Sequence, residues 1–360
     1  MDRLVVAGGG TGGHLYPGIA VAREASAVGC RVLFIGTEAG IEAMVLPKEG
    51  LELRTIKAGK YMGMGIAGKI RTIAGLPGAV GSAAGILREF RPQAVLGVGG
   101  YASFPVLAAA RLLGIPFVIQ EQNAWPGLTN RTLGRFAGRV ALGFREAERF
   151  FDSKKTVFTG NPVRSTLYHV ERRKALAEFG LEDGRTTVLV FGGSGGAHTI
   201  NKGVTDALSG MSGMDDRLQF IHQTGGQDLA FVEKAYAGSG FRATVHPYIY
   251  NMAGAYACAD IVVCRSGALT LAELTALGKP ALLIPYPFAA NNHQEHNARA
   301  LESAGAARVI MDSEADGQRL ATEILAMVDD TAALSEMSKK SRALGRPDAA
   351  KDVLGILMKY

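Results

Sequence analysis

Two stretches of this chain combine glycines with a histidine, residue types that suit anion binding and proton transfer. The apolar run Leu4–Ala7 leads into Gly8–His14, and Val188–Phe191 leads into Gly192–His198, with both segments displaced by the same number of residues. Backbone N–H groups at such a loop and helix start can bind an anion, and an imidazole can accept a proton near neutral pH. The glycines would equally serve as tight turns, and His14 could simply donate to backbone at a helix start. Two loops in matching positions favour ligand binding over a single accidental turn.

A third stretch has the pattern of a strand, a glycine turn, a helix and a second strand. Ile261–Cys264 is apolar and β-branched, which predicts a buried parallel strand. Residues 269–277 carry apolar side chains at helical spacing and stop at Gly278, and Pro280–Pro285 predicts the next strand. In such a unit the helix N-terminus lies at the carboxyl edge of the sheet, where it suits a phosphate.

Polar side chains around this unit suit a nucleotide or a sugar. Glu273 lies in or next to the predicted first turn, where its carboxylate could bind a ribose diol or form a capping box with Thr270. An amide cluster follows the second strand, and amides bind sugar hydroxyls but are also common in turns. The cluster consists of Asn291, Asn292, Gln294 and Asn297.

Predicted strands and helices alternate along the chain, and this alternation occurs twice, once in each half. It predicts an α/β protein with two doubly wound, Rossmann-like domains. The length of 360 residues suits two domains, and 47 glycines suit many tight strand–helix turns. The alternation is interrupted at 159–164, so we predict domains at 1–162 and 163–345. Polar residues, Glu121 and Asn123 among them, follow a predicted strand in the first half. Helices are predicted from Pro17 to about residue 27 and from about residue 317 to 343.

Composition excludes several classes of protein. No run of ~18 apolar residues predicts a spanning helix, and the first strand begins too early for a signal peptide. The cysteines Cys30, Cys258 and Cys264 have no metal-site spacing and predict buried thiols in a reducing cytoplasm. Residues 1–162 hold 19 Lys and Arg against 11 Asp and Glu, which indicates an anionic partner. No recognition-helix or zinc pattern supports nucleic acid as that partner.

The segment Lys57–Arg91 mixes basic residues with apolar ones and has a single acid, Glu89. This mixture suits a membrane surface with anionic lipid, and it also suits a loop followed by a core helix with solvated ends.

Seven short motifs, in order along nearly the whole chain, resemble the MurG family of N-acetylglucosaminyltransferases of bacterial peptidoglycan synthesis. The motifs are GGTGGH at 9–14, GVGGY at 97–101, EQN at 121–123, GNPVR at 160–164, GGS at 192–194, CRSGALTLAE at 264–273 and HQEHNA at 293–298. The resemblance implies a GT-B architecture, two domains facing across a cleft, with a last helix at about 346–360 packing back on the first domain. It implies an inverting transfer of GlcNAc from UDP-GlcNAc to the MurNAc 4-hydroxyl of undecaprenyl-linked lipid I, which gives lipid II.

The resemblance also implies site residues. The implied donor contacts are Thr11, Gly12, Gly13, Asn123, Arg164, Ser194, Ile249, Ala268, Leu269, Thr270, Leu271, Ala272, Glu273 and Gln294. Gly10 and Tyr101 would contact the acceptor. The base on the acceptor hydroxyl is His14 or Glu121. The family usually has Gln where this chain has Gly195, so a donor contact by that side chain is missing.

The implied reaction needs no cofactor, and we expect no obligatory metal because no acidic pair follows a strand. The helix start at 268–271 would instead stabilise the negative charge on the leaving diphosphate. We expect a cytoplasmic protein bound peripherally to the inner face of the membrane, where it could dock to other wall-synthesis enzymes. Three alternatives stay open: a glycolipid synthase of the same fold, a nicotinamide dehydrogenase, and a UDP-sugar sensor without activity.

Overall fold

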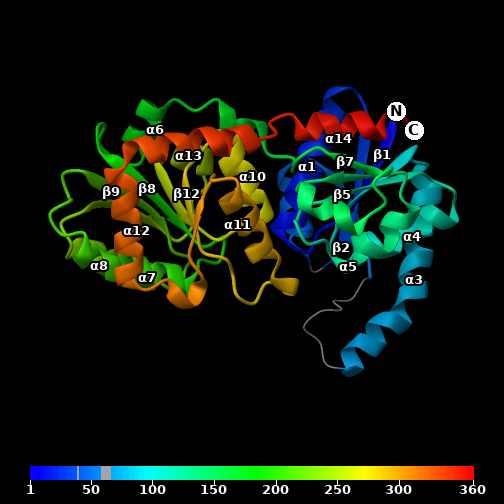
Figure 1. Ribbon diagram of the computed structural model, residues 1–360. Helices are drawn as coiled ribbons and strands as arrows, with labels where there is room; N and C mark the ends of the chain where they lie inside the picture. The colour runs from blue at the N-terminus through cyan, green and yellow to red at the C-terminus, as the bar shows by residue number, and fades with distance from the viewer. Residues whose placement is uncertain (39, 58–65) are drawn as a thin grey trace. The chain divides into compact units, whose positions relative to one another are not determined.

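The computed structural model describes residues 1–38, 40–57 and 66–360. The chain divides into two compact units, Met1–Arg164 with Arg346–Tyr360 (unit 1) and Ser165–Gly345 (unit 2). Each unit is a parallel sheet with helices on both of its faces (Figure 1). The predicted fold class, two doubly wound α/β domains, is confirmed.

Unit 1 is built on a sheet of seven strands in the order β3-β2-β1-β4-β5-β6-β7. Its strands are β1 (Arg3–Gly8), β2 (Arg31–Thr37), β3 (Glu52–Ile56), β4 (Ala94–Gly99), β5 (Phe117–Glu121), β6 (Arg139–Leu142) and β7 (Thr156–Phe158). Its α-helices are α1 (Gly12–Ala27), α2 (Glu42–Lys48), α3 (Ile66–Phe90), α4 (Ser103–Leu112), α5 (Leu128–Leu133) and α14 (Ala349–Leu357), and the short 3₁₀ helices are η1 (Gly134–Phe136) and η2 (Arg145–Phe150).

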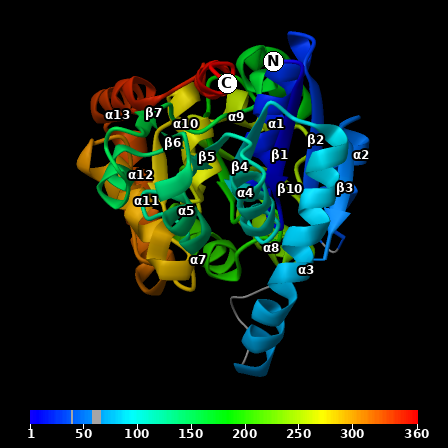
Figure 2. The ribbon, with the colours of Figure 1, turned by 90° about the vertical axis from the view of Figure 1, so that its right-hand side faces the viewer.

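The central strand β1 buries both of its faces, as expected of a parallel strand. Leu4 and Val6 pack in one cluster with α1 and α14, whereas Val5 and Ala7 pack in a second cluster with α3 and α4. The last helix therefore belongs to the core of unit 1, on the same face as α1. Figure 2 shows α3 beside β2 and β3, with its N-terminal turns extending past the sheet.

Unit 2 repeats this plan with six strands in the order β10-β9-β8-β11-β12-β13. Its strands are β8 (Thr186–Phe191), β9 (Leu218–Gln223), β10 (Arg242–His246), β11 (Ile261–Cys264), β12 (Ala281–Leu283) and β13 (Arg308–Val309). Its α-helices are α6 (Arg172–Glu178), α7 (His198–Gly210), α8 (Leu229–Ala237), α9 (Met252–Cys258), α10 (Ala268–Leu277), α11 (His293–Ser303), α12 (Gly317–Asp329) and α13 (Thr331–Leu344), and its 3₁₀ helices are η3 (Ser165–Tyr168), η4 (Ala290–Asn292) and η5 (Asp312–Glu314).

The strand order places a switch point in each sheet, between β1 and β4 in unit 1 and between β8 and β11 in unit 2. The two glycine loops that the sequence singled out follow β1 and β8, so each lies at a switch point. Ligands of doubly wound folds bind at this position, outside the carboxyl ends of the strands.

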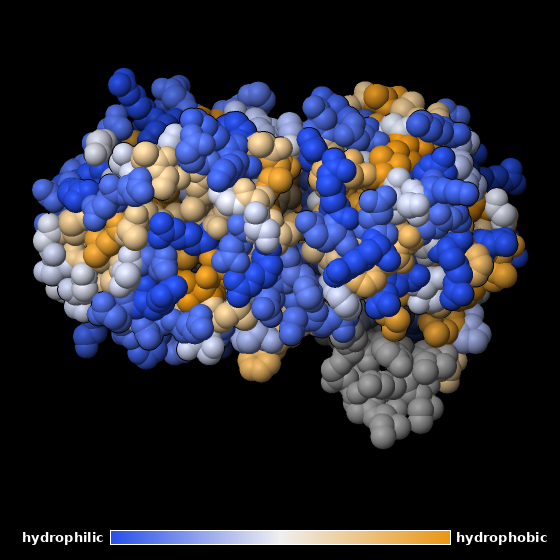
Figure 3. Space-filling model, viewed as in Figure 1, coloured by the Kyte–Doolittle hydropathy of each residue, from blue (hydrophilic) through white to orange (hydrophobic). Residues whose placement is uncertain are grey.

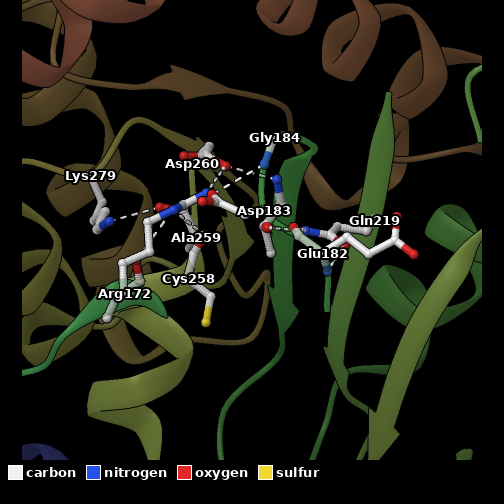
Figure 4. Close-up of polar contacts among 11 residues, drawn as sticks. Arg172, Glu182, Asp183, Gly184, Gln219, Cys258, Ala259, Asp260 and Lys279 are labelled. Carbon is white, nitrogen blue, oxygen red and sulfur yellow. Dashed lines mark hydrogen bonds and ion pairs between the residues drawn. The ribbon is translucent and has the colours of Figure 1, made fainter. Parts of the chain in front are cut away.

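The amino edge of the unit 2 sheet carries a half-buried polar cluster (Figure 4). Asp260 accepts hydrogen bonds from the Thr187 N–H at 2.8 Å and the Arg172 guanidinium at 2.9 Å. Lys279 donates to the Ala259 carbonyl at 2.7 Å, and burial is the main reason that its pKa falls to about 8. These charges lie at the edge opposite the glycine loop, so they support the sheet and leave the carboxyl edge to ligands.

The surface drawn in Figure 3 is mostly hydrophilic in each unit, with hydrophobic residues in small groups between charged ones. Across the described ranges, every helix is too short or too polar to cross a membrane. The three cysteines are buried and free, as predicted.

Two helix boundaries differ from the sequence-based prediction. The first helix begins at Gly12 instead of Pro17, so His14 lies inside its first turn. Pro17 resembled a helix start because proline favours the first helical position, yet here it lies further in. The stretch predicted as one helix from 317 to 343 is two helices, because Asp330 accepts a hydrogen bond from the Ala333 N–H at 2.8 Å and caps the second.

Candidate functional site

The glycine loops after β1 and β4 touch each other backbone to backbone. The Gly9 N–H donates to the Gly99 carbonyl at 3.3 Å. A Cβ on Gly8 would overlap Gly99, and a Cβ on Gly100 would overlap the Gly9 backbone. Only glycine fits this approach, so the glycines of both motifs have a structural role at the switch point of unit 1.

His14 lies against this pair of loops. Its Nδ1 is 3.1 Å from Thr11 Oγ1, and its ring covers Gly99, where a Cβ would overlap the imidazole. Gly10 lies beside the Tyr101 ring, which a Cβ at Gly10 would approach to 3.3 Å. The structure therefore brings together Thr11, His14 and the two predicted acceptor residues, and it fixes the imidazole at the carboxyl edge of the sheet.

Glu121, the alternative base, is buried and engaged at both oxygens. Oε1 accepts from the Asn123 N–H at 2.9 Å, while Oε2 accepts from the Asn130 side chain at 2.9 Å and the Gly127 N–H at 3.2 Å. Burial raises the pKa of this carboxyl, against the opposing effect of these hydrogen bonds. Its contacts order the loop between β5 and α5, which carries Asn123.

Arg164, a predicted donor ligand that we assigned to the second domain, falls within unit 1. Its guanidinium lies 5.5 Å from the centre of the Tyr16 ring, a cation–π contact with α1. The preceding Asn161 is buried and donates to the Gln122 carbonyl at 2.9 Å. The motif at 160–164 is thus fixed against α1, the helix that contains His14, and against the loop after β5.

In unit 2 the helix start at the switch point belongs to α10. Its N-cap is Gly267, without a side-chain cap, so the first N–H groups of the helix lie where the loop after β11 ends. Ala268, Leu269, Thr270 and Leu271 form the first turn, and Ala272 and Glu273 follow in the second. Exposed Ser194 lies on the neighbouring glycine loop after β8.

Glu273 accepts a hydrogen bond from the Tyr256 hydroxyl at 2.9 Å. The alternative of a capping box with Thr270 is wrong, because the cap position is Gly267, three residues earlier. The Tyr256 bond fixes the carboxylate from the α9 side, and it uses one of about four acceptor positions that a carboxylate offers.

Gln294 is tied to the loops after β11 and β12. Its Oε1 accepts from the Tyr286 N–H at 3.0 Å, and its carbonyl accepts from the Ser266 hydroxyl at 2.7 Å. Two residues of the predicted amide cluster, Asn291 and Asn292, have φ of 53° and 51°, so they form the turn before α11. Buried Asn297 donates to the Ser266 carbonyl at 3.3 Å, so its side chain is held beside the start of α10, whereas the Gln294 side chain is held by the loop after β12.

Gln223 was missed by the sequence analysis. Its side chain donates to the Gly193 carbonyl at 2.8 Å and accepts from the Ile249 N–H at 2.7 Å. It therefore connects the glycine loop with Ile249, two predicted parts of the donor site. No pattern around Gln223 signals this, since the same strand contains two other polar residues, Gln219 and His222.

Within the described part of the chain, no group of three or more His, Cys, Asp or Glu side chains is arranged to hold a metal ion.

Comparison with known proteins shows similarity along nearly the whole chain. Residues 4–142 match the model of the glycosyltransferase family 28 N-terminal domain, and residues 187–353 match that of the family 28 C-terminal domain. A relative in Myxococcus xanthus is 47% identical over 358 residues, covering 99% of this chain and 92% of the relative. One in Thermodesulfovibrio yellowstonii is 45% identical over 358 residues, covering 98% and 97%. Both relatives are named UDP-N-acetylglucosamine--N-acetylmuramyl-(pentapeptide) pyrophosphoryl-undecaprenol N-acetylglucosamine transferase.

A solved structure gives the short name of such enzymes. The crystal structure of Acinetobacter baumannii MurG is 31% identical to this chain, with a TM-score of 0.81 and full coverage of both chains. The chain belongs to the MurG family. The family resemblance predicted from the motifs is thereby confirmed, together with the GT-B fold class. A UDP-GlcNAc 2-epimerase from Neisseria meningitidis, 15% identical with a TM-score of 0.71, shares the fold alone.

Membership of the MurG family sets the dehydrogenase alternative aside. A dinucleotide-binding fold needs an acid after its second strand, and the residue there, Glu38, is exposed. The acid that does contact the first glycine loop is Glu42, whose Oε2 accepts from the Gly10 N–H at 2.7 Å.

Proposed function

We propose that this chain transfers N-acetylglucosamine from UDP-GlcNAc to undecaprenyl-diphospho-MurNAc-pentapeptide, converting lipid I to lipid II. The observation that carries the proposal is the identity of 45–47% to transferases of that name over nearly the whole of both chains. The arrangement of residues at the two switch points supports it, as follows.

Unit 2 would bind the donor. The start of α10, whose N-cap Gly267 has no capping side chain, would direct the positive end of a helix dipole toward the diphosphate, beside Ser194. Glu273, held by Tyr256, would accept from the ribose hydroxyls, and Gln294 would bind hydroxyls of the sugar. Ile249 would lie against the nucleotide, at the position that Gln223 fixes.

Unit 1 would supply the base. We assign it to His14, because its ring is held at the carboxyl edge through Thr11 and covers Gly99. Glu121 then orders the loop that carries Asn123, since its carboxylate is buried and already bonded at both oxygens. The α-linked donor would give a β-linked product by one displacement, with the proton of the acceptor hydroxyl passing to the imidazole.

The leaving diphosphate must be stabilised as the glycosidic bond breaks. We assign that role to the α10 start, Ser194 and Arg164, whose guanidinium the Tyr16 contact orients. We therefore expect transfer without an obligatory metal.

The acceptor is held by a lipid, so the protein should bind a membrane surface peripherally. The segment at 57–91 lies partly outside the described residues, but exposed residues in η1 and at the end of α4, the helix that packs on α3, support the idea. Leu112 and Phe136 are exposed, and the guanidinium groups of Arg111 and Arg135 lie 5.8 and 5.3 Å from the Phe136 ring centre. Apolar side chains flanked by arginines suit a leaflet with anionic lipid. Docking to other wall-synthesis enzymes stays a prediction.

Flotation with liposomes tests the membrane proposal. Wild-type protein should float with vesicles that contain anionic lipid, and a Leu112→Glu, Phe136→Ser double variant should float less at equal stability. Exposed Val28, on the α1 side of unit 1, provides the control substitution Val28→Glu. If the wild type floats neither with vesicles that contain anionic lipid nor with vesicles that lack it, the proposal of membrane binding is wrong.

Acceptor-dependent release of UDP tests the reaction. Purified protein is given UDP-GlcNAc with a short-chain lipid I analogue, with diacylglycerol, or with no acceptor. Release only with the lipid I analogue supports the proposal. Release only with diacylglycerol would make the chain a glycolipid synthase of the same fold, and donor binding without release would make it a sensor.

A further inference from the structure

Glu42 is a carboxylate buried at the first glycine loop. It is the first residue of α2 and is fully buried. Its Oε2 accepts from the Gly10 N–H at 2.7 Å, and its Oε1 accepts from the Thr37 N–H at 2.7 Å and the Thr37 hydroxyl at 2.8 Å. One carboxylate thus joins the carboxyl ends of β1 and β2.

Three glycines make room for this carboxylate. A Cβ on Gly9, Gly36 or Gly40 would overlap the side chain of Glu42. They come from three separate segments, namely the loop after β1, strand β2 and the turn before α2. Such a convergence forms a closed site shaped around a carboxylate, and it accounts for glycines that no substrate needs to approach.

The N–H group that Glu42 binds belongs to the loop where doubly wound folds usually hold a ligand phosphate. Here a carboxylate of the chain itself occupies that N–H. The next residue, Thr11, has its hydroxyl 3.1 Å from Nδ1 of His14. The chain of contacts from Glu42 through Gly10 and Thr11 therefore ends at the proposed base.

We propose that Glu42 is a positioning residue for catalysis: an internal anion that replaces substrate phosphate at the Gly10 N–H and fixes the loop that orients His14. The role in catalysis rests on the proposed function. The proposal also refines the expected acceptor contact at Gly10, because the backbone N–H of that residue is not offered to the acceptor diphosphate.

Glu42→Gln tests this role with little change of shape. An amide has one acceptor oxygen, so its NH₂ group would face either the Gly10 or the Thr37 N–H. We expect kcat to fall about tenfold or more, because misplacement of a catalytic group by an ångström can cost about a hundredfold. The KM for UDP-GlcNAc should stay within about twofold, since the proposed donor contacts of unit 2 are untouched. The control is Val353→Ala, which opens a cavity in the α14 core of unit 1 but does not touch the loop.

Rescue separates an anion from a mere space filler. Glu42→Ala should recover kcat with acetate, which restores the carboxylate, but not with acetamide, which has the same size and no charge. Equal rescue by both compounds, or an unchanged kcat in Glu42→Gln, would overturn the proposal. Rescue by inorganic phosphate in place of acetate would also overturn it, because the loop would then be a phosphate site.

Amide exchange in the wild-type protein gives a readout that needs neither turnover nor a folded variant. The Gly10 and Thr37 N–H groups should be protected from exchange and should not shift in NMR spectra when inorganic phosphate is added. Fast exchange at Gly10, or a phosphate-dependent shift there, would contradict the proposal. A protected Gly10 in a protein that fails to release UDP would instead locate the failure in the proposed reaction.

Discussion

At the scale of single residues, the proposed chemistry depends on one imidazole, and the chain contains a natural comparison for it. His14 and His198 both follow a glycine loop, and each lies in the first turn of a helix at a switch point. Their surroundings differ. His14 covers Gly99 beside Thr11, whereas His198 is exposed with its Nδ1 3.0 Å from Asp228. The two histidines therefore have the same position in the fold, but only His14 lies beside residues predicted to contact the acceptor.

Substitution of these histidines should have unequal effects. His14→Ala should lower kcat by about 10²–10⁴, the usual cost of losing a general base, with the KM for UDP-GlcNAc nearly unchanged. His198→Ala should leave kcat within about twofold, because a surface pair of this kind stabilises little. Steady-state kinetics at saturating acceptor measure both. Equal losses in the two variants, or a His14→Ala variant with wild-type kcat, would remove His14 from the role of base.

Glu121 allows a test through stability at different pH. Burial raises the pKa of its carboxyl in the folded state, so the native protein keeps a proton that the unfolded chain loses above pH ~4.3. Its contribution to stability is therefore largest below that pH and declines as the pH rises through the folded-state pKa. As the pH rises, the free energy of unfolding of the wild type should fall relative to that of Glu121→Gln, by at most about 1.4 kcal/mol per pH unit.

Denaturant unfolding of both proteins from pH 4 to pH 7 measures this difference. A wild type that gains stability relative to Glu121→Gln as the pH rises would mean that the hydrogen-bond donors outweigh burial. The carboxylate would then be the form that the fold favours.

At the scale of elements, the sequence predicted the parts that depend on local pattern. Apolar β-branched runs predicted β1, β8 and β11, and Gly278 with its φ of 64° ends α10 where the glycine predicted. The start of α1 was missed because a proline inside a helix resembles one at the first position.

Contacts between segments that are distant in the chain could not be predicted from a single sequence. Glu42 and Gln223 join loops that are far apart in the chain, and nothing adjacent to either residue marks its partner. The position of Glu273 in its helix depended on which residue caps α10, and a glycine cap gave no side-chain signal. The motif resemblance supplied the predicted site residues, and the fold shows the contacts that hold several of them, among them His14, Glu273 and Gln294.

The glycine loop of unit 2 allows a paired test. A Cβ on Gly195, where the family usually has Gln, would meet nothing within 4 Å, whereas a Cβ on Gly196 would overlap the Thr224 carbonyl. Gly196 also has a φ of 79°, which disfavours a side chain. Gly195→Gln should therefore keep or raise stability, by about 0.4–1 kcal/mol from the stiffer unfolded chain, and Gly196→Gln should lose more than that.

Thermal unfolding and donor kinetics measure this pair. Gly195→Gln should also lower the KM for UDP-GlcNAc if the family contact is regained. Loss of stability in Gly195→Gln equal to that in Gly196→Gln would contradict the loop geometry, and an unchanged KM would show that the amide adds no donor contact.

At the scale of the whole molecule, the two units repeat one plan and differ at their switch points. Unit 1 fills its glycine loop with the carboxylate of Glu42 and presents His14, whereas unit 2 leaves the start of α10 without a side-chain cap. An internal anion in one unit and an uncapped helix start in the other suit the proposed division of labour, in which unit 1 positions the base and unit 2 binds the donor diphosphate.

The most direct test of the account is the NMR spectrum of the product formed from UDP-GlcNAc and a lipid I analogue in the presence of EDTA. A single displacement with a histidine base and a helix start at the diphosphate predicts a β-linked disaccharide, formed at the same rate with and without EDTA. An α-linked product would contradict the displacement, and a rate abolished by EDTA and restored by a divalent cation would contradict the assigned stabilisation of the leaving group.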